Sequence, residues 1–362
     1  MSELGHLLIR GVNWLGDAVM TMPALQRLRE AHPYTRFTLL THEKLADLWC
    51  GHPVINDVVT FSNGESPRIV GRRLRNLGIG AALIFPNSLR AAFECWYAKI
   101  PRRIGYASKW RRLLLTDALP RHPGHTTMHK RTLREIERRI AKGALPAEFP
   151  PKAHHMHHYL CLAAVLGADP VPIVPRVTVS EGEINELKQK FSLPIKTPLL
   201  TFIPGAEYGS AKRWPAARFA AVAKTARRER QLHILFLGGL GDQVIAEEII
   251  SMLEPSAYTN LTGRTTLREL AVGLAASSCV FTNDTGPMHL AAAVDVPVVA
   301  LFGSTSPELT SPGLQGEGDS KVQILRAPPP CAPCFLRECP LDARCLNNIS
   351  VESAVSAIDQ AL

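Results

Sequence analysis

The chain has 362 residues, of which 46% are hydrophobic and 20% are charged, and this composition excludes a disordered or collagen-like protein. The length favours two domains over one. Residues 1–170 contain 24 Lys and Arg against 13 Asp and Glu, a net charge of +11, whereas residues 171–362 have a net charge of −2. This asymmetry predicts that the two halves bind different partners.

In the first half, apolar runs of strand length alternate with longer segments of helical periodicity. Strands are expected at 6–10, 36–41, 57–61, 81–86 and 102–106, and helices at 18–30, 43–49, 66–77, 88–98, 126–141 and 154–166. Such alternation is typical of βαβ units on a parallel sheet.

Residues 167–178 (GADPVPIVPRVT) contain three prolines and are the expected linker between domains. The alternation then restarts, with strands expected at 198–204, 233–238, 279–283 and 297–303, and helices at 214–229, 242–253, 266–276, 286–294 and 351–362. The chain is therefore predicted to be an α/β protein of two Rossmann-like domains facing across a cleft, with ligands at the carboxyl ends of the strands.

The N-terminal sequence MSELGHLLIRGVNW has neither a basic n-region nor a cleavage-type site, and no run approaches the ~18 apolar residues of a membrane span. We therefore expect a cytoplasmic protein. In a reducing compartment, Cys50, Cys95, Cys161 and Cys279 are expected to be small buried hydrophobic residues.

The segment RGVNWLGD (10–17) follows the first expected strand, and its glycines permit a tight loop. It lacks the G-x-G-x-x-G spacing of a dinucleotide-binding loop. Asp17 stands where the next helix is expected to begin, so it is either an N-cap or a functional carboxylate. Because an acid would repel phosphate, a functional Asp17 is best interpreted as a general base.

The segment PGAEYGSAKRWP (204–215) lies between a strand and a helix, with Pro215 expected in the first turn of that helix. Lys212 and Arg213 would then lie near a helix N-terminus, where the helix dipole disfavours cations. This placement indicates an anion-binding site. The alternative is a solvated pair of basic residues.

In NDTGPMH (283–289), Asp284 or Thr285 could cap the following helix, so that the nearby amides point toward an anion. Thr285 and His289 are four residues apart and share a helix face. A further glycine turn, GGLGD (238–242), places Asp242 where its carboxylate could accept hydrogen bonds from a ribose.

The motifs GVNWLGDAVMTMPAL, PGAEYGSAKRWP and NDTGPMHLAAA resemble, in this order, those of the ADP-heptose:lipopolysaccharide heptosyltransferases, glycosyltransferase family 9. The similarity extends to about residue 310 and is greatest to the branch that adds the second inner-core heptose. It implies a GT-B fold, with an acceptor-binding domain at 1–170 and a nucleotide-sugar domain at 171–362. The latter would include a Cys-rich segment at 331–345 and the C-terminal helix.

The resemblance implies inverting transfer of L-glycero-D-manno-heptose from ADP-heptose to the first heptose of Hep-Kdo2-lipid A, with no required metal or other cofactor. By motif, Asp17 would be the general base, and Lys212 would stabilise the departing diphosphate. The nucleotide-sugar site would comprise Lys212, Arg213, Asp242, Asp284, Thr285, Gly286 and His289. The acceptor-side loop would comprise Asn13, Trp14 and Gly16.

Two clusters have the composition of metal sites. Cys331, Cys334, Cys339 and Cys345 could bind zinc, but their spacings are shorter than those of paired C-x2-C sites, so reduced or structural thiols are favoured. The run HHMHH (154–158) lacks neighbouring carboxylates or cysteines, and we interpret its histidines as exposed polar residues.

Basic clusters recur in the first half, at 72–75, 102–103, 109–112 and 130–139. Together they suit an anionic lipopolysaccharide acceptor at the cytoplasmic face of the inner membrane, with peripheral membrane contact. The alternatives are a heptosyltransferase that uses another core acceptor, or another GT-B nucleotide-sugar enzyme such as an epimerase. Nucleic-acid binding is disfavoured because the basic residues are not interleaved with aromatic ones.

Overall fold

The computed structural model describes residues 5–145, 147–150, 152–255, 258–313 and 321–362. The chain forms two compact units: unit 1 comprises residues 1–125 and 151–175, and unit 2 comprises residues 126–150 and 176–362. Each unit is built on a six-stranded parallel sheet with helices on both faces.

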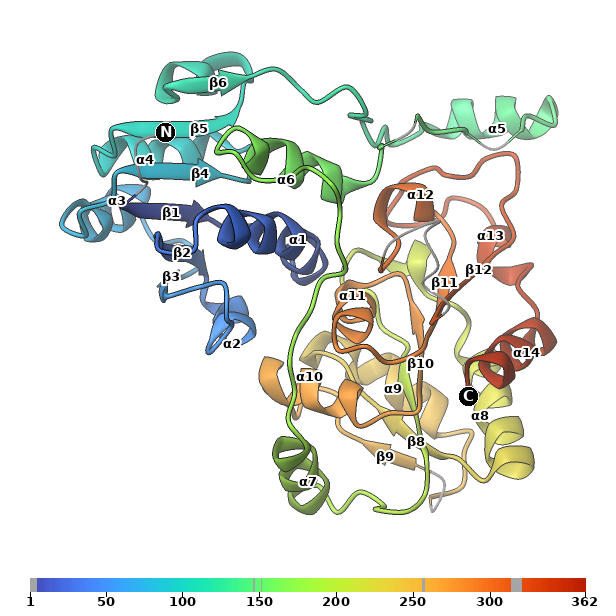
Figure 1. Ribbon diagram of the computed structural model, residues 1–362. Helices are drawn as coiled ribbons and strands as arrows, with labels where there is room; N and C mark the ends of the chain where they lie inside the picture. Colours follow the sequence, from blue (N-terminus) through green and yellow to red (C-terminus); the bar gives the residue numbers. More distant parts are fainter. Residues whose placement is uncertain (1–4, 146, 151, 256–257, 314–320) are drawn as a thin grey trace. The chain divides into compact units, whose positions relative to one another are not determined.

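The sheet of unit 1 has the strand order β3-β2-β1-β4-β5-β6 (Figure 1). Its strands are β1 His6–Arg10, β2 Arg36–His42, β3 Asp57–Phe61, β4 Ala81–Ile84, β5 Arg102–Tyr106 and β6 Asp117–Leu119. Its helices are α1 Leu15–Ala31, α2 Ala46–Trp49, α3 Pro67–Arg75, α4 Leu89–Tyr97 and α6 His155–Ala164, with 3-10 turns η1 Glu43–Leu45 and η2 Lys109–Leu114.

The central strands of unit 1 are apolar on both faces because both faces are covered by helices. Leu8, Leu40 and Ile84 pack in a core with residues of α3 and α4, such as Leu74 and Cys95. The helices α1 and α6 pack against each other, and α3 packs against α4.

Unit 2 repeats the same topology, with the strand order β12-β11-β10-β7-β8-β9. Its strands are β7 Leu199–Ile203, β8 His233–Phe236, β9 Tyr258–Asn260, β10 Cys279–Asn283, β11 Val298–Phe302 and β12 Val322–Arg326. Its helices are α5 Leu133–Ala141, α7 Glu181–Lys190, α8 Ala216–Arg230, α9 Gln243–Ile250, α10 Leu267–Ala275, α11 Gly286–Ala293, α12 Pro307–Thr310, α13 Arg344–Asn347 and α14 Val351–Ala361, with 3-10 turns η3 Ser210–Lys212 and η4 Leu240–Asp242.

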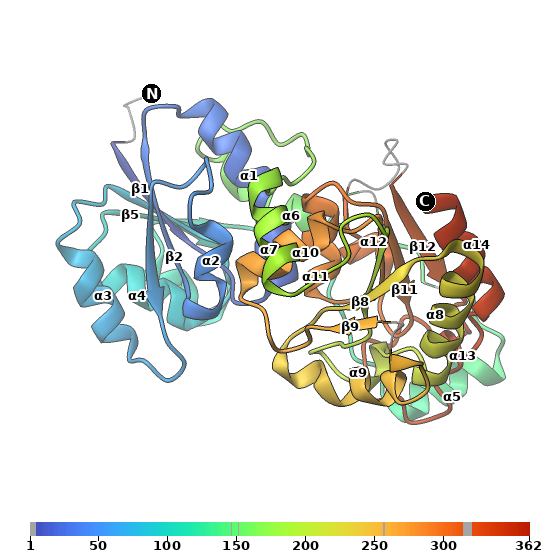
Figure 2. The same ribbon diagram turned by 90° about the horizontal axis from the view of Figure 1, so that it is seen from below.

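An aromatic cluster fills the core of unit 2 on the side of α8 and α14, which lie side by side (Figure 2). Phe202 of β7 and Phe281 of β10 contact Phe219 of α8, and Trp214 contacts both Phe219 and Phe281, mostly edge to face. These rings are fully buried and fix α8 to the two central strands.

The segment 126–150 groups with unit 2, although the sequence analysis placed it in the first domain. Two hydrogen bonds join this segment to unit 2: Arg131 donates to the backbone carbonyl of Cys331, and Arg139 donates to that of Pro330. The expected helix at 126–141 begins only at Leu133, because Thr132 and Glu135 form a capping box. With this assignment the net charges are +8 for unit 1 and +1 for unit 2.

The expected strands and most expected helices are found within a few residues of their predicted bounds. Six helices and strands of the described residues were not predicted: β6, α7, β9, α12, β12 and α13. Within the described ranges, no helix is long and apolar enough to cross a membrane.

Candidate active site

In both sheets the strand order reverses beside the first strand, which is the Rossmann order. In unit 2 this switch point lies between β7 and β10, which pair directly, with Thr282 opposite Ile203. Open parallel sheets bind ligands in the crevice beyond such a point. The segments 204–215 and 284–289 both begin there, so the fold brings these two motifs together.

Asn283, at the end of β10, joins the two motifs. Its amide nitrogen donates to the carbonyl of Pro204 (2.7 Å), and its side-chain oxygen accepts from the backbone amide of Trp214 (3.1 Å). Because Asn283 is fully buried, both hydrogen bonds are shielded from water. The Lys212 loop is thus fastened at both ends to the neighbouring strand.

Lys212 forms an ion pair with Asp284, with 2.7 Å between Nζ and Oδ2. The Lys212 side chain is 13% exposed and that of Asp284 is 4% exposed. Thr305 donates to the same Asp284 oxygen at 2.5 Å, and Lys212 Nζ lies 5.0 Å from the centre of the Tyr208 ring. These contacts hold the ammonium group at the carboxyl edge of the sheet.

Asp242 and Arg213 lie near the same loop. Asp242 accepts a hydrogen bond from the Gly239 amide (3.0 Å), and its carboxylate packs so closely on Gly205 that a Cβ there would lie 1.8 Å from Oδ1. Burial raises the pKa of Asp242, although the Gly239 hydrogen bond and Arg213 oppose this effect. Arg213 donates through Nη2 to the Ala206 carbonyl (3.3 Å).

Helix α11 begins at Gly286, with Thr285 as the N-cap residue. Of the two predicted caps, Thr285 is therefore the one found, and its side chain makes no capping hydrogen bond. Pro287 removes one further donor from the first turn. His289 lies one turn along and is buried, with 5% exposed.

The Cys-rich segment supports the Lys212 loop, a relationship that its distance in the sequence conceals. Tyr208 Oη donates to the Phe335 carbonyl (2.7 Å), and the Ala211 amide donates to the Arg337 carbonyl (2.9 Å). Gly209 packs against the same Arg337 carbonyl at a φ of 155°, where a Cβ would lie 2.3 Å from the oxygen. Only glycine fits this close approach.

The four thiols of this segment line one hollow together with Ala211 and Ser304. All eight cysteines of the chain are free thiols. Burial raises the pKa of Cys345 to about 12, and the neighbouring thiols, Cys334 first, act in the same direction. Cys339 Sγ accepts a hydrogen bond from the Ala343 amide (3.3 Å). The four thiols thus converge on one hollow, and metal binding by them stays the less favoured alternative to reduced or structural thiols.

In unit 1, Asp17 lies in the first turn of α1 and Trp14 is the N-cap, so the interpretation of Asp17 as the helix cap is wrong. Tyr159 of α6 donates to Asp17 Oδ1 at 3.4 Å. Tyr159 is nearly buried, and burial followed by the Asp17 carboxylate raises the pKa of this phenol well above its usual value. The carboxylate is therefore held between α1 and α6.

The loop between β1 and α1 presents exposed side chains to solvent. Asn13 is exposed, and Trp14 is 46% exposed with Lys44 Nζ 5.0 Å from the centre of its ring. Gly11 lies against Leu40, whose carbonyl oxygen would be 3.2 Å from an added Cβ. Gly16 belongs to the first turn of α1.

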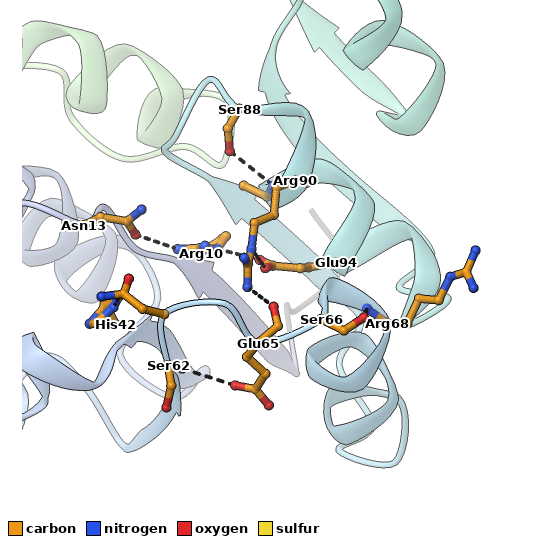
Figure 3. A network of polar contacts seen from close by, with 12 residues as sticks. Arg10, Asn13, His42, Ser62, Glu65, Ser66, Arg68, Ser88, Arg90 and Glu94 are labelled. Atoms are coloured by element: carbon orange, nitrogen blue, oxygen red, sulfur yellow. Dashed lines mark hydrogen bonds and ion pairs between the residues drawn. The ribbon is translucent and has the colours of Figure 1, made fainter.

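Beneath this loop lies a buried ionic network that the sequence did not reveal (Figure 3). Arg10, which ends β1, and Glu94 of α4 are 1% and 0% exposed and form an ion pair of 2.8 Å. Arg90 pairs with the other oxygen of Glu94 at 2.8 Å, and Arg10 also donates to Gly11 O and Asn13 Oδ1. The network thus anchors the Asn13 loop to α4.

Not all residues of the predicted basic clusters are surface charges. Arg111 is buried and donates to the carbonyls of Tyr106 and Pro86, so it is a structural residue. Arg102 pairs with Asp117. The cluster at 130–139 belongs to unit 2. Exposed basic side chains remain in unit 1 at Arg72, Arg73, Arg75, Lys109 and Arg112.

Two parallel sheets in Rossmann order, each with motif residues at its switch point, define an α/β protein of the GT-B class. Residues 126–344 match the family model for glycosyltransferase family 9 (heptosyltransferase). Lipopolysaccharide heptosyltransferase 2 of Salmonella typhimurium is 32% identical over 322 residues, which cover 84% of this chain and 85% of the relative. The chain belongs to glycosyltransferase family 9, the heptosyltransferases.

The fold of this chain is also similar to solved structures of the same family. The structure of E. coli ADP-heptose lps heptosyltransferase II superposes with a TM-score of 0.79 at 26% identity, covering 98% of each chain. The glycosyl transferase family 9 structure from Veillonella parvula also has a TM-score of 0.79, at 21% identity, covering 99% of this chain and 98% of that one. The predicted GT-B fold and enzyme family are confirmed.

The structure gathers the predicted residues of unit 2, from Lys212 to His289, around one switch point. Asp17, Asn13, Trp14 and Gly16 gather at the β1 end of unit 1. Sequence reasoning missed the supporting residues Tyr208, Asn283 and Thr305. Asn283 and Tyr208 lie inside the recognised motifs. Thr305 lies two residues after the strand predicted at 297–303, and this position was its only signal.

Proposed function

We propose that this heptosyltransferase moves L-glycero-D-manno-heptose from ADP-heptose to the first heptose of Hep-Kdo2-lipid A, with inversion at the anomeric carbon. The single observation that carries the proposal is the Lys212–Asp284 pair at the switch point of the second sheet. The relatives named above, which are lipopolysaccharide heptosyltransferases, support the choice of donor and acceptor.

The donor diphosphate would bind at the edge of unit 2. Lys212 supplies a cation that is already positioned by Asp284 and the Tyr208 ring. Arg213 supplies a second cation, whose buried Nε donates to no acceptor within the described residues. Thr285, Gly286 and His289 would line the phosphate site at the start of α11, and Asp242 would lie near the adenosine ribose.

In the reaction, Asp17 would take the proton from the acceptor hydroxyl as that oxygen attacks the anomeric carbon of the donor. The bond between this carbon and the diphosphate oxygen breaks, and ADP leaves with the bonding electron pair. Lys212 and Arg213 would stabilise the negative charge that grows on the diphosphate. A single displacement needs one base and no enzyme nucleophile, and inversion follows from it.

The acceptor would bind unit 1, whose net charge of +8 complements a phosphorylated, Kdo-bearing glycolipid. The turn η2 adds a surface suited to a membrane interface. Trp110 and Leu113 are 76% and 74% exposed, and exposed Lys109 and Arg112 flank them. Aromatic and basic side chains in this arrangement favour an anionic lipid surface. We therefore propose peripheral contact at the cytoplasmic face of the inner membrane.

The test is ADP release from ADP-heptose with a panel of acceptors: Kdo2-lipid A, Hep-Kdo2-lipid A and an acceptor that already carries two heptoses. Release is expected only with Hep-Kdo2-lipid A, with an inverted anomeric configuration in the product by NMR. Release with Kdo2-lipid A alone would overturn the assigned acceptor. A preference for UDP-sugars over ADP-heptose would overturn the assigned donor.

A further inference from the structure

Three histidines from separate parts of unit 1 converge at the end of β6 and the start of α6. His122 and His125 lie in the segment that follows β6, and His158 lies in the first turn of α6. Each offers one ring nitrogen, and these three nitrogens all lie within 4.8 Å of one another. The ring centres are 5.7 to 6.1 Å apart.

Neighbouring residues hold the cluster in place. The Tyr106 hydroxyl donates to the His158 carbonyl (2.8 Å), and its ring centre lies 4.2 Å from that of His158. The His125 amide donates to the His122 carbonyl (2.9 Å), which closes a turn between these two ligand candidates. Asn87, after β4, lies 3.3 Å from His158 Nε2 through its amide nitrogen.

Burial favours the neutral form of all three imidazoles. Burial lowers the pKa of His158 to about 3, with His122, His155, His125 and Arg111 acting in the same direction. Burial likewise lowers the pKa values of His122 and His125, the latter together with Arg121. A neutral imidazole has the lone pair that a metal ion requires.

We propose that His122, His125 and His158 bind one late first-row divalent cation, with Zn2+ as the expected occupant. Imidazole nitrogen suits Zn2+, Co2+, Ni2+ and Cu2+, whereas Mg2+ and Ca2+ prefer oxygen ligands. Metal–nitrogen distances of ~2.0–2.1 Å require the nitrogens to approach to about 3.3 Å, so the imidazoles would have to rotate toward the ion on binding. Three protein ligands leave a further coordination position for water or an anionic oxygen.

Such an ion would fasten the segment after β6 to α6. The chain leaves unit 1 directly after His125 and returns to it at residue 151, just before α6. The ion would therefore link the two separate stretches of chain that make up unit 1. It would also hold α6 where the residue after His158, Tyr159, donates to Asp17. The transfer reaction itself would need no metal.

The test uses untagged full-length protein, stripped with chelator and titrated with Co2+ or Zn2+ alone. One equivalent of Co2+ should give visible d–d bands without thiolate charge transfer, and Zn2+ should raise Tm. His125→Ala and His158→Ala should each weaken Co2+ binding by about tenfold or more and abolish the Tm rise. The matched control is His129→Ala, an exposed histidine four residues from His125, which should bind like the wild type.

Two results would overturn the histidine site: unchanged Co2+ affinity in both cluster variants, or a Co2+ spectrum with thiolate charge transfer that both cluster variants retain. The second would place the ion on the Cys-rich segment 331–345 instead. His125→Ala is the variant of choice because the His125 side chain is only half-buried in a loop. Circular dichroism of the variant is the check that it folds. Since the readout is spectroscopic, it is independent of heptose transfer.

Discussion

Lys212 Nζ lies 2.7 Å from Asp284 Oδ2, and the two residues come from loops that follow adjacent strands of one sheet. The carboxylate fixes the position of the ammonium group that we propose as the diphosphate ligand. A preorganised cation stabilises developing negative charge without a reorganisation step. The same pairing means that removal of either partner leaves a nearly buried charge without its counterion.

Lys212→Ala should lower kcat for ADP release by roughly 10²–10³-fold, which is typical for the loss of one group that stabilises transition-state charge. Lys224→Ala, an exposed lysine on α8, is the matched control and should retain wild-type turnover. Steady-state kinetics with saturating acceptor measure the difference. A kcat of Lys212→Ala within threefold of the wild-type value would show that Lys212 does not stabilise the transition state.

Asp17→Asn should lower turnover by about 10²–10⁴-fold, because the amide cannot accept the acceptor proton. ADP binding by calorimetry should be unchanged, since Asp17 belongs to unit 1 and the proposed nucleotide residues belong to unit 2. Asp47→Asn, at an exposed carboxylate in the same unit, is the control. Turnover by Asp17→Asn above a tenth of wild type would contradict the base assignment.

Gly205→Ala and Gly241→Ala form a matched pair in the nucleotide loops. At Gly205 a Cβ would lie 1.8 Å from Asp242 Oδ1, whereas at Gly241 it would meet nothing within 4 Å. Gly205→Ala should therefore displace the Asp242 carboxylate and weaken ADP binding by about tenfold or more, equivalent to ~1.4 kcal/mol. Gly241→Ala should bind ADP normally. Equal affinities for both variants would argue against a nucleotide role for this loop.

Glu94→Ala should lower the free energy of unfolding by about 3–5 kcal/mol, because it leaves the guanidinium of Arg10 buried without its counterion. The exposed pair of Arg228 and Glu229 offers the contrast, and Glu229→Ala should change stability by about 0.5 kcal/mol or less. Urea denaturation of both variants measures the difference. A small effect at Glu94 would show that water or another residue solvates Arg10 in the variant.

Burial, with a smaller effect of Arg227, lowers the pKa of His233 below its usual value of about 6.5. Below pH 6.5 the unfolded chain therefore binds a proton at His233 that the folded chain does not, so the free energy of unfolding falls as the pH falls from 6.5 toward the folded pKa. His233→Gln, whose amide can still reach Thr259, should reduce this slope by at most ~1.4 kcal/mol per pH unit. An unchanged slope between pH 7 and 5 would contradict the assignment.

The parallel sheets were predictable because their strands are short apolar runs buried on both faces, as in β7, β10 and β11. The missed elements include two short edge strands and one helix with a readable N-terminal pattern. β6 and β9 have three residues each and are edge strands with little periodicity. By contrast, α7 has a clear N-terminal pattern, the capping box of Ser180 and Glu183, that the sequence analysis did not use.

The site was predictable as far as its motifs are continuous in the chain. Lys212 and Asp284 were assigned to one site from the positions of their loops after strands. The contribution of Thr305 and of the Phe335 and Arg337 carbonyls depends on where distant segments return to the sheet, which no local pattern encodes. The position of His158 also depends on distant segments. Its neighbours in the run HHMHH indicate a surface residue, whereas the fold brings His122 and His125 beside it.

The chain changes unit at residues 125–126, 150–151 and 175–176, so neither unit is a continuous stretch of sequence. A protein truncated to residues 171–362 would lose α5 and with it the hydrogen bonds from Arg131 and Arg139 to the Cys-rich segment. That segment in turn supports the loop that carries Lys212. An excised second unit of this chain must therefore be engineered as a fusion that restores residues 126–150. A chimera that exchanges the C-terminal half of this chain must carry these residues with it.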